Sequence, residues 1–345
     1  MSSALTRQMP PVQHAAVNGI DMAYYEVGPR GKGTPLIFCH GFPELAFSWR
    51  HQLKACEAAG IWAIAPDQRG YGLTSRPEAI TDYDMEHLTG DLVGLLDHLG
   101  AQKAVFLGHD WGGLVVWQMP LRHRDRCAGI IGLNTPFLPR GPFDPIAAMR
   151  MAFGEDMYIV WFQKPGLADA ALGADVDKTM RFFMRRPGDV EAAAAEAAAR
   201  RAGVFDTDAP EAPTSTGVTF AFGDLLRDWD KSDTANQLLT ADELAAFVES
   251  FEATGFTGGI NWYRNFTRNW EAAADLPTRI DDLPCLMIMA EKDVVLSPAM
   301  AEPMGQFIGD LEKVLVKDSG HWTQQEKPDE VNRLVIDWMK RRFPA

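Results

Sequence analysis

Short apolar runs alternate with helical patterns along most of this chain, and this alternation constrains its fold more than any other feature. The runs contain no alternating polar residues, which is typical of strands buried on both faces of a parallel sheet. They lie at residues 36–39, 61–65, 104–107, 129–133, 286–289 and 314–316. Between them, apolar residues recur at helical spacing, most clearly over 88–99 and 331–339. Strands that alternate with helices predict an α/β fold with a mostly parallel, doubly wound sheet.

The alternation stops after Leu133 and resumes near Leu283, and the segment between them has a different pattern. After a proline-rich stretch it reads as helices, with an alanine-rich helix expected over 191–202, a turn-forming loop over 207–217 and a helix over 239–253. We interpret it as a helical insertion within one sheet rather than as a second domain in series. The predicted parts are a core domain over 1–135 and 275–345 and a helical cap domain over 136–274.

Charge and composition argue against several classes of partner. The net charge of −14 opposes binding to nucleic acids and anionic lipid, which recruit clustered Lys and Arg. The amino-terminal residues lack the apolar region of a signal peptide, and no run of about 18 apolar residues is present to span a membrane. We therefore expect a soluble cytoplasmic protein with no nucleic-acid or membrane partner. Cysteines without metal-ligand spacing predict reduced core thiols at positions 39, 56, 127 and 285.

The stretch GHDWGG at 108–113 carries the first indication of chemistry. It follows an apolar run and precedes a helical pattern. Its glycines have the spacing of a nucleophile elbow, the sharp turn that exposes a catalytic side chain at the edge of an α/β sheet. The central position holds Asp110, where an esterase would have serine. An aspartate that only caps the following helix is the alternative interpretation of this turn.

Two further candidate residues follow later strands. Asp293 comes soon after the run 286–289 and His321 soon after the run 314–316. Nucleophile, acid and histidine then appear in the chain order of α/β hydrolases, with the acid after a late strand. Asn134 follows an earlier strand, but its side chain is neutral, which leaves Asp293 as the better candidate for the acid.

The stretch HGFPE at 40–44 follows the first apolar run, as an oxyanion loop does. The backbone N–H groups of Phe42 and Trp111 are therefore the expected donors of an oxyanion hole. We interpret His40 as a buried, hydrogen-bonding histidine. His109 is also expected to be structural, with its side chain turned away from Asp110.

A carboxylate at the elbow predicts a different reaction from that of a serine. It can displace a leaving group at saturated carbon and become an alkyl ester. His321 can then activate water to attack the ester, while the oxyanion hole stabilises the intermediate on Asp110. The expected substrates are epoxides or alkyl halides, and the reaction needs neither a cofactor nor a metal.

An epoxide opens to a basic alkoxide, so it needs a proton donor that a halide does not. Tyr158 and Tyr263 lie in aromatic-rich segments of the expected cap. A phenol with a pKa near 10 can donate a proton and stay neutral at pH 7. Two such tyrosines facing Asp110 would form an acid clamp, whereas tyrosines buried in the core with satisfied hydroxyl groups are the alternative.

Taken together, these motifs make the chain resemble the soluble epoxide hydrolases of the α/β-hydrolase fold. The similarity covers nearly the whole chain and is most specific in FQKPG and NWYRN of the cap, besides HGFPE, DQRGYG, GHDWGG, LNTPF, AEKDVV and SGHW. It implies a cap inserted after the sixth strand and a cis bond between Phe42 and Pro43. It also implies the following roles: nucleophile for Asp110, charge pair for Asp293 and His321, oxyanion-hole amides for Phe42 and Trp111, and ring-opening acids for Tyr158 and Tyr263.

Other functions predict different residues. A haloalkane dehalogenase shares the aspartate elbow but needs a second hydrogen-bond donor for the halide. The side chain of Phe42 is no donor, although the indole of Trp161 or Trp262 in the expected cap could serve as one. A ligand receptor on this fold can lose a catalytic residue, but this chain has all of them. The expected partners are thus a small-molecule epoxide and water, and no charge pattern or apolar run indicates an oligomer interface.

Overall fold

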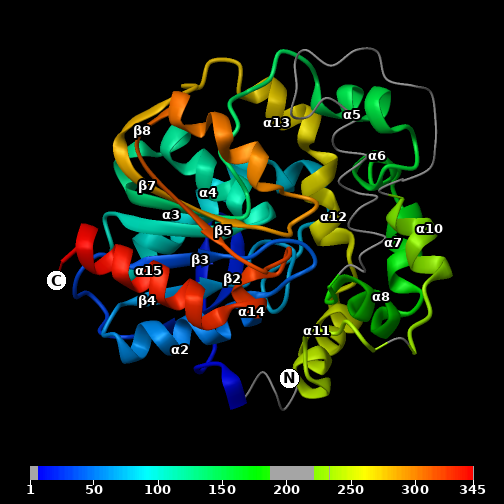
Figure 1. Cartoon of the computed structure of the whole chain (residues 1–345), viewed down its shortest axis with the longest axis horizontal. Coiled ribbons are helices and arrows are strands. Elements are labelled where there is room, and N and C mark those ends of the chain that lie inside the picture. The colour runs from blue at the N-terminus through cyan, green and yellow to red at the C-terminus, as the bar shows by residue number, and fades with distance from the viewer. Residues whose placement is uncertain (1–6, 187–220, 233, 345) are drawn as a thin grey trace.

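The computed structural model describes residues 7–186, 221–232 and 234–344, and a sheet of eight strands runs through its centre (Figure 1). The strands are β1 (Gln13–Val17), β2 (Ile20–Val27), β3 (Leu36–Cys39), β4 (Ala63–Pro66), β5 (Ala104–His109), β6 (Cys127–Leu133), β7 (Ile280–Ala290) and β8 (Ile308–Val316). Their order across the sheet is β1-β2-β4-β3-β5-β6-β7-β8. The pairs β1/β2 and β2/β4 are antiparallel and all the others are parallel. The predicted mostly parallel sheet is confirmed.

Helices cover both faces of the sheet, as a doubly wound fold requires. The connection from β3 through α2 (Arg50–Ala58) to β4 runs toward one edge, and that from β5 through α4 (Trp111–Arg122) to β6 runs toward the other. Right-handed connections in opposite directions place their helices on opposite faces. Helix α15 (Pro328–Arg342) packs on α2, and α3 (Met85–Leu99) packs on α4 (Figure 1). The chain also forms η1 (Ala46–Trp49), η2 (Ile80–Tyr83), η3 (Arg124–Arg126), η4 (Pro298–Gln306) and α14 (Thr323–Glu326).

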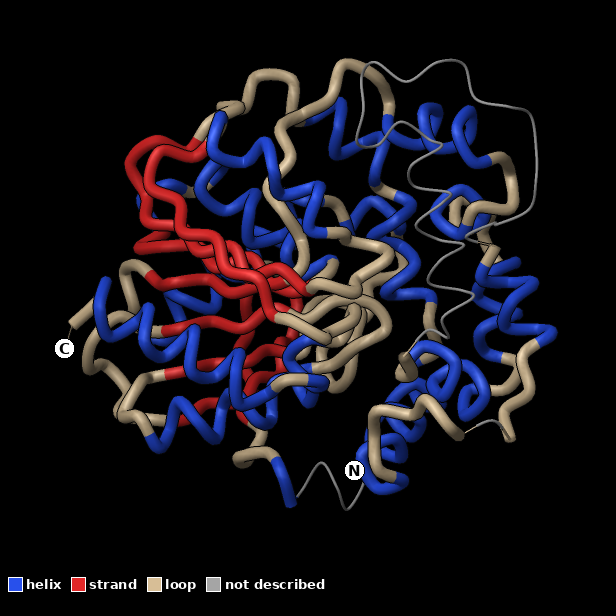
Figure 2. The backbone as a smooth tube through the Cα atoms, in the orientation of Figure 1, coloured by secondary structure: helices blue, strands red, loops and turns tan. Residues whose placement is uncertain are grey.

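The described chain between β6 and β7 is helical and lies beyond the loops at one end of the sheet (Figure 2). Its helices are α5 (Pro145–Phe153), α6 (Tyr158–Trp161), α7 (Leu167–Gly173), α8 (Val176–Phe183), α10 (Phe222–Asp228), α11 (Ala241–Thr254), α12 (Thr257–Arg264) and α13 (Phe266–Ala272). Helix α11 begins two residues later than predicted, because Thr240 and Glu243 form a capping box at its start. The helix expected over 191–202 and the loop expected over 207–217 lie outside the described residues.

Several strands differ from the sequence prediction, and β7, for example, covers 11 residues where the predicted run was 286–289. β1 and β2 form a hairpin that no apolar run marked, because β1 alternates between buried and exposed residues. β8 is longer than the predicted run 314–316. The rest of the strand was not predicted, because most of its residues are at least partly exposed at the other edge of the sheet and form no apolar run. In the interior, β3 has the predicted bounds and is fully buried. All four cysteines are free and buried, as predicted.

Candidate active site

The turn between β5 and α4 holds Asp110 in a backbone conformation that side chains rarely adopt, with φ 51° and ψ −121°. Two glycines allow the chain to turn this tightly. A Cβ atom at Gly108 would lie 2.1 Å from the Gly112 carbonyl oxygen, and one at Gly112 would lie 2.0 Å from the Cys39 carbonyl oxygen. A side chain at either position would therefore force the turn away from the sheet.

The two carboxylate oxygens of Asp110 have different surroundings. Oδ1 accepts the backbone N–H of Phe42 at 2.8 Å, and the backbone N–H of Trp111 also hydrogen-bonds to this carboxylate. The Phe42–Pro43 bond is cis. Oδ2 lies 3.8 Å from Nε2 of His321. Burial raises the pKa of Asp110, while the neighbouring histidines and the two N–H groups oppose that rise. One oxygen thus accepts the backbone N–H of Phe42 and the other faces an imidazole.

His321 lies between two carboxylates. Its Nδ1 is 2.9 Å from Oδ2 of Asp293, whose other oxygen accepts the backbone N–H groups of Val295 and Leu296 at 2.9 and 3.0 Å. Burial alone would raise the pKa of Asp293, but His321 and the hydrogen bonds hold it well below its usual range. Burial alone would lower the pKa of His321, but Asp293 and Asp110 raise it to about 9. With both carboxylates ionised, the imidazole therefore carries its second proton at neutral pH.

Tyr158 of α6 and Tyr263 of α12 lie together near the elbow. Their ring centroids are 5.9 Å apart, and the Tyr263 ring packs edge-on against Trp111 at 5.0 Å and Phe42 at 5.4 Å. Both side chains are buried. Burial, followed by the charge of Asp110, raises the pKa of each phenol above its usual value. Both phenols are thus protonated at neutral pH, and the charge of Asp110 contributes to their raised pKa values.

A buried pair beneath the elbow links three loops of the site, and sequence reasoning missed it. His109 places Nδ1 2.9 Å from Oε2 of Glu44 and Nε2 2.7 Å from the backbone carbonyl oxygen of His321. The same Glu44 oxygen accepts the backbone N–H of Gly41 at 2.9 Å. Burial alone would raise the pKa of Glu44, but His109 lowers it to about 2. Glu44 is part of HGFPE, yet no sequence pattern indicates its partner, because the contact joins different strands.

His40 is buried, as expected, and its ring is used in hydrogen bonds. Nδ1 lies 3.0 Å from the Gly41 carbonyl oxygen, and Nε2 accepts the backbone N–H of Gln68 at 3.0 Å.

Phe222, at the start of α10, is a second residue near the site that the sequence did not predict. Its ring stacks on Tyr158 with centroids 4.4 Å apart and planes inclined by 14°. The sequence held no signal for this contact, since α10 was not predicted.

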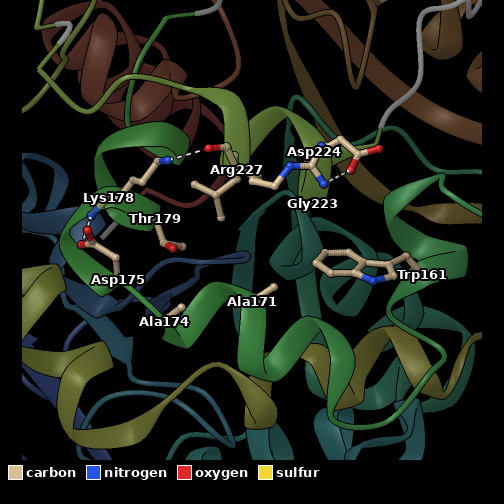
Figure 3. Close-up of a pocket in the computed structure, with 10 residues that line it drawn as sticks. Trp161, Ala171, Ala174, Asp175, Lys178, Thr179, Gly223, Asp224 and Arg227 are labelled. Carbon is tan, nitrogen blue, oxygen red and sulfur yellow. Dashed lines mark hydrogen bonds and ion pairs between the residues drawn. The ribbon is translucent and has the colours of Figure 1, made fainter.

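A pocket of about 540 Å³ lies in the helical segment that joins β6 to β7, between α7, α8 and α10 (Figure 3). Its charged groups are already paired, since Lys178 donates to the Arg227 carbonyl oxygen and Arg227 pairs with Asp224. Trp161 lines this pocket, and the Trp262 indole donates to the Arg69 carbonyl oxygen at 3.1 Å. None of the candidate catalytic residues lines it, so the pocket is separate from the elbow.

The described residues hold neither a cluster suited to a metal ion nor a helix that could cross a membrane. No cluster of three or more His, Cys, Asp or Glu side chains suited to a metal ion occurs among them. Within the same residues, no helix combines the length and the apolar character needed to cross a membrane.

Known proteins similar to this chain share its fold over almost its entire length. The family model described as alpha/beta hydrolase fold matches residues 34–328. The chain is 44% identical to epoxide hydrolase A of Mycobacterium tuberculosis over 93% of its own length and 95% of that protein. It is 38% identical to bifunctional epoxide hydrolase 2 of Mus musculus, covering 54% of that longer protein. The crystal structure of epoxide hydrolase A from Mycobacterium thermoresistibile superposes with a TM-score of 0.82 at 41% identity, covering 96% of this chain and 98% of that one.

Proposed function

This chain belongs to the epoxide hydrolases of the α/β-hydrolase fold, and from that premise we propose that it converts epoxides to vicinal diols through an alkyl ester on Asp110. The observation that carries the proposed mechanism is that backbone N–H groups and an imidazole meet at this carboxylate, while two buried phenols lie near its turn and are influenced by its charge. We further propose that residues 136–274 act as a cap domain on a core of 1–135 and 275–345.

In the first step, Oδ2 of Asp110 attacks an epoxide carbon, and the bond from that carbon to the epoxide oxygen breaks. The leaving oxygen takes a proton from Tyr158 or Tyr263. The charge of Asp110 contributes to the raised pKa of both tyrosines. That charge disappears as the ester forms, so each phenol becomes a better acid just when the alkoxide develops.

In the second step, His321 acts as the base. Esterification removes one of the two carboxylates that raise the pKa of His321. The tyrosinate left by the first step takes a proton from the His321 imidazolium, which leaves His321 neutral. His321 then takes a proton from water as the water attacks the ester carbon, and the Phe42 and Trp111 N–H groups stabilise the oxyanion on Oδ1. The tetrahedral intermediate then breaks the bond between the ester carbon and the substrate oxygen. That oxygen takes the remaining proton of the attacking water, which gives the diol and the Asp110 carboxylate.

The donor set favours epoxides over alkyl halides. The Trp262 indole is already bonded to a backbone carbonyl, and Trp161 lines the separate pocket in the cap. Position 42 is phenylalanine, which offers no side-chain donor. Release of chloride or bromide from simple haloalkanes, without diol formation from epoxides, would reverse this assignment.

A single turnover in water labelled with heavy oxygen tests the proposed mechanism. With the protein in excess over a simple aryl epoxide, the first diol should be unlabelled, because its new oxygen comes from Asp110. Mass analysis should find the label in the peptide that contains Asp110. A labelled diol with an unlabelled peptide would mean that water attacks the epoxide directly, and the ester would have to be abandoned.

Replacing Asp293 with alanine should slow ester hydrolysis by roughly 10²–10⁴-fold and ester formation much less. The reason is that Asp293 reaches the substrate only through His321, to which it is bonded at 2.9 Å. Rapid-quench measurements of ester and diol separate the two rates. The role assigned to Asp293 would be wrong if the variant formed the ester slowly but hydrolysed it at the normal rate.

Ester hydrolysis should fall on acidification, by about tenfold per pH unit below the pKa of His321 in the esterified protein. The pKa of His321 is raised to about 9 by Asp293 and Asp110 in the free protein, and losing the Asp110 charge brings it down. The midpoint should therefore lie below pH 9, with the slow rate on the acidic side. Stopped-flow measurements of ester decay give this profile, and a rate that stays constant from pH 5 to 8 would exclude His321 as the base.

A further inference from the structure

Asn134 occupies a position that no sequence pattern singled out as functional. It follows β6 with a left-handed φ of 62°, which asparagine tolerates better than most residues. Its backbone N–H donates to the Ile288 carbonyl oxygen of β7 at 2.8 Å, and its side chain is buried. The residue is thus anchored at the end of β6 against the neighbouring strand β7, whose end carries the acid partner of the base.

The side-chain NH₂ group of Asn134 faces Asp293 and the loop that carries His321. Nδ2 lies 2.6 Å from Oδ2 of Asp293, 3.1 Å from the His321 carbonyl oxygen and 3.3 Å from the Gly320 carbonyl oxygen. All three neighbours are acceptors only, so the NH₂ group and not the oxygen must face them. The Asn134 oxygen is buried and has no hydrogen-bond partner among the described residues. No other orientation of the amide would satisfy the carboxylate.

Asn134 therefore competes with His321 for one oxygen atom, since Oδ2 of Asp293 also accepts from Nδ1 of His321 at 2.9 Å. A neutral donor on a carboxylate stabilises its charge and weakens its attraction for a neighbouring imidazolium. We propose that Asn134 is a positioning residue that tethers the loop of the base and weakens the hold of Asp293 on the His321 proton. This inference rests on the proposed function, in which His321 must be neutral to activate water.

The other titratable groups that face His321 would be unchanged by a substitution at position 134. They are Asp110 at 3.8 Å, Glu44 as a more distant carboxylate, and His109, whose ring centroid is 4.9 Å from that of His321. The donors Val295 and Leu296 also remain on the other oxygen of Asp293. A shift in the titration of His321 would therefore report the lost amide.

The variant Asn134→Gly tests the proposal, because glycine accepts the positive φ and removes only the side chain. We expect the pH midpoint of ester hydrolysis to rise by about one unit, while ester formation changes less than about threefold. At pH 7 hydrolysis should be several-fold slower, and raising the pH should recover it. A slower rate with an unchanged midpoint would mean that Asn134 is only structural, and the proposal would fall.

Asn18→Gly is the matched control. Asn18 also has a positive φ of 43°, and its amide also joins a carboxylate and a backbone carbonyl, Asp91 at 2.9 Å and His87 at 3.1 Å. Its substitution should lower stability without moving the midpoint, and an equal shift in this control would overturn the proposal. If Asn134→Gly does not fold, Asn134→Ser serves instead, because its shorter side chain should not reach Asp293 and the same upward shift is expected.

An NMR titration of the His321 imidazole in the resting protein separates this inference from the proposed function. It needs no substrate, so it can be read even if the protein forms no ester. The His321→Gln spectrum assigns the signal. In Asn134→Gly the imidazole should lose its proton at a higher pH than in the unsubstituted protein, and identical titrations would contradict the role given to Asn134.

Discussion

Replacing His321 with glutamine is expected to stop turnover after the first chemical step and leave the protein esterified at Asp110. Diol formation should fall by a factor on the order of 10⁴ or more, because His321 is the base that we propose to activate water. Oδ2 of Asp110 should still attack the epoxide, since Phe42 and both tyrosines are untouched. Intact-protein mass measurement after mixing with the epoxide should show one substrate mass added per chain, and peptide mapping should place it on Asp110.

Two variants control that experiment. Asp110→Ala should show neither the added mass nor diol, which ties the adduct to the elbow. His14→Gln alters an exposed histidine of β1 that pairs with Asp21, and it should turn over normally. If His321→Gln released diol at the normal rate, or if the added mass mapped to another residue, the roles of Asp110 as nucleophile and His321 as base would be wrong.

Removing both phenolic hydroxyl groups, in the double variant Tyr158→Phe and Tyr263→Phe, should abolish ring opening. General acids contribute roughly 10²–10⁴-fold each, so we expect a loss of at least about 10⁴-fold for the pair and smaller losses for the single variants. The ester should not form either, in contrast to the His321 variant. A rapid-quench experiment with the protein in excess, analysed for both ester and diol, makes this distinction.

Tyr71→Phe is the matched control for the tyrosine pair. Tyr71 is also buried and also packs edge-on against an indole, that of Trp262 at 5.4 Å, and its hydroxyl group has no hydrogen-bond partner in the part of the chain that the structure describes. Loss of that hydroxyl should leave diol formation nearly unchanged. Diol formation near the normal rate in the double variant would eliminate Tyr158 and Tyr263 as the ring-opening acids.

How far the sequence predicts this fold depends on how deeply each strand is buried. β3, β5 and β6 lie in the middle of the sheet, and their uninterrupted apolar runs made them recognisable. β1 and the outer part of β8 are partly exposed, so their side chains alternate or become polar and the apolar signal is lost. The helices between β6 and β7 were recognised in outline only, because short helices carry weak periodicity.

For the candidate site, the sequence predicts what lies at strand ends and misses what depends on contacts between loops. Asp110, Asp293 and His321 each follow a strand, so chain order alone brought them together as candidates. Glu44 meets His109, and Asn134 meets Asp293, only after the strands have paired. These polar contacts leave no spacing pattern, since partners far apart in the chain can take any separation.

The pairing of β6 with β7 also has a consequence for how the chain reaches this structure. Ile130 lies beside Cys285 in the sheet, although the entire inserted segment separates them in the chain. Contacts of such long range are slow to form, because the chain loses loop entropy before the contact stabilises it. During synthesis the elbow is complete long before the histidine has been made. The arrangement of Asp110, Asp293 and His321 should therefore form in one late step, when β7 and β8 join the sheet.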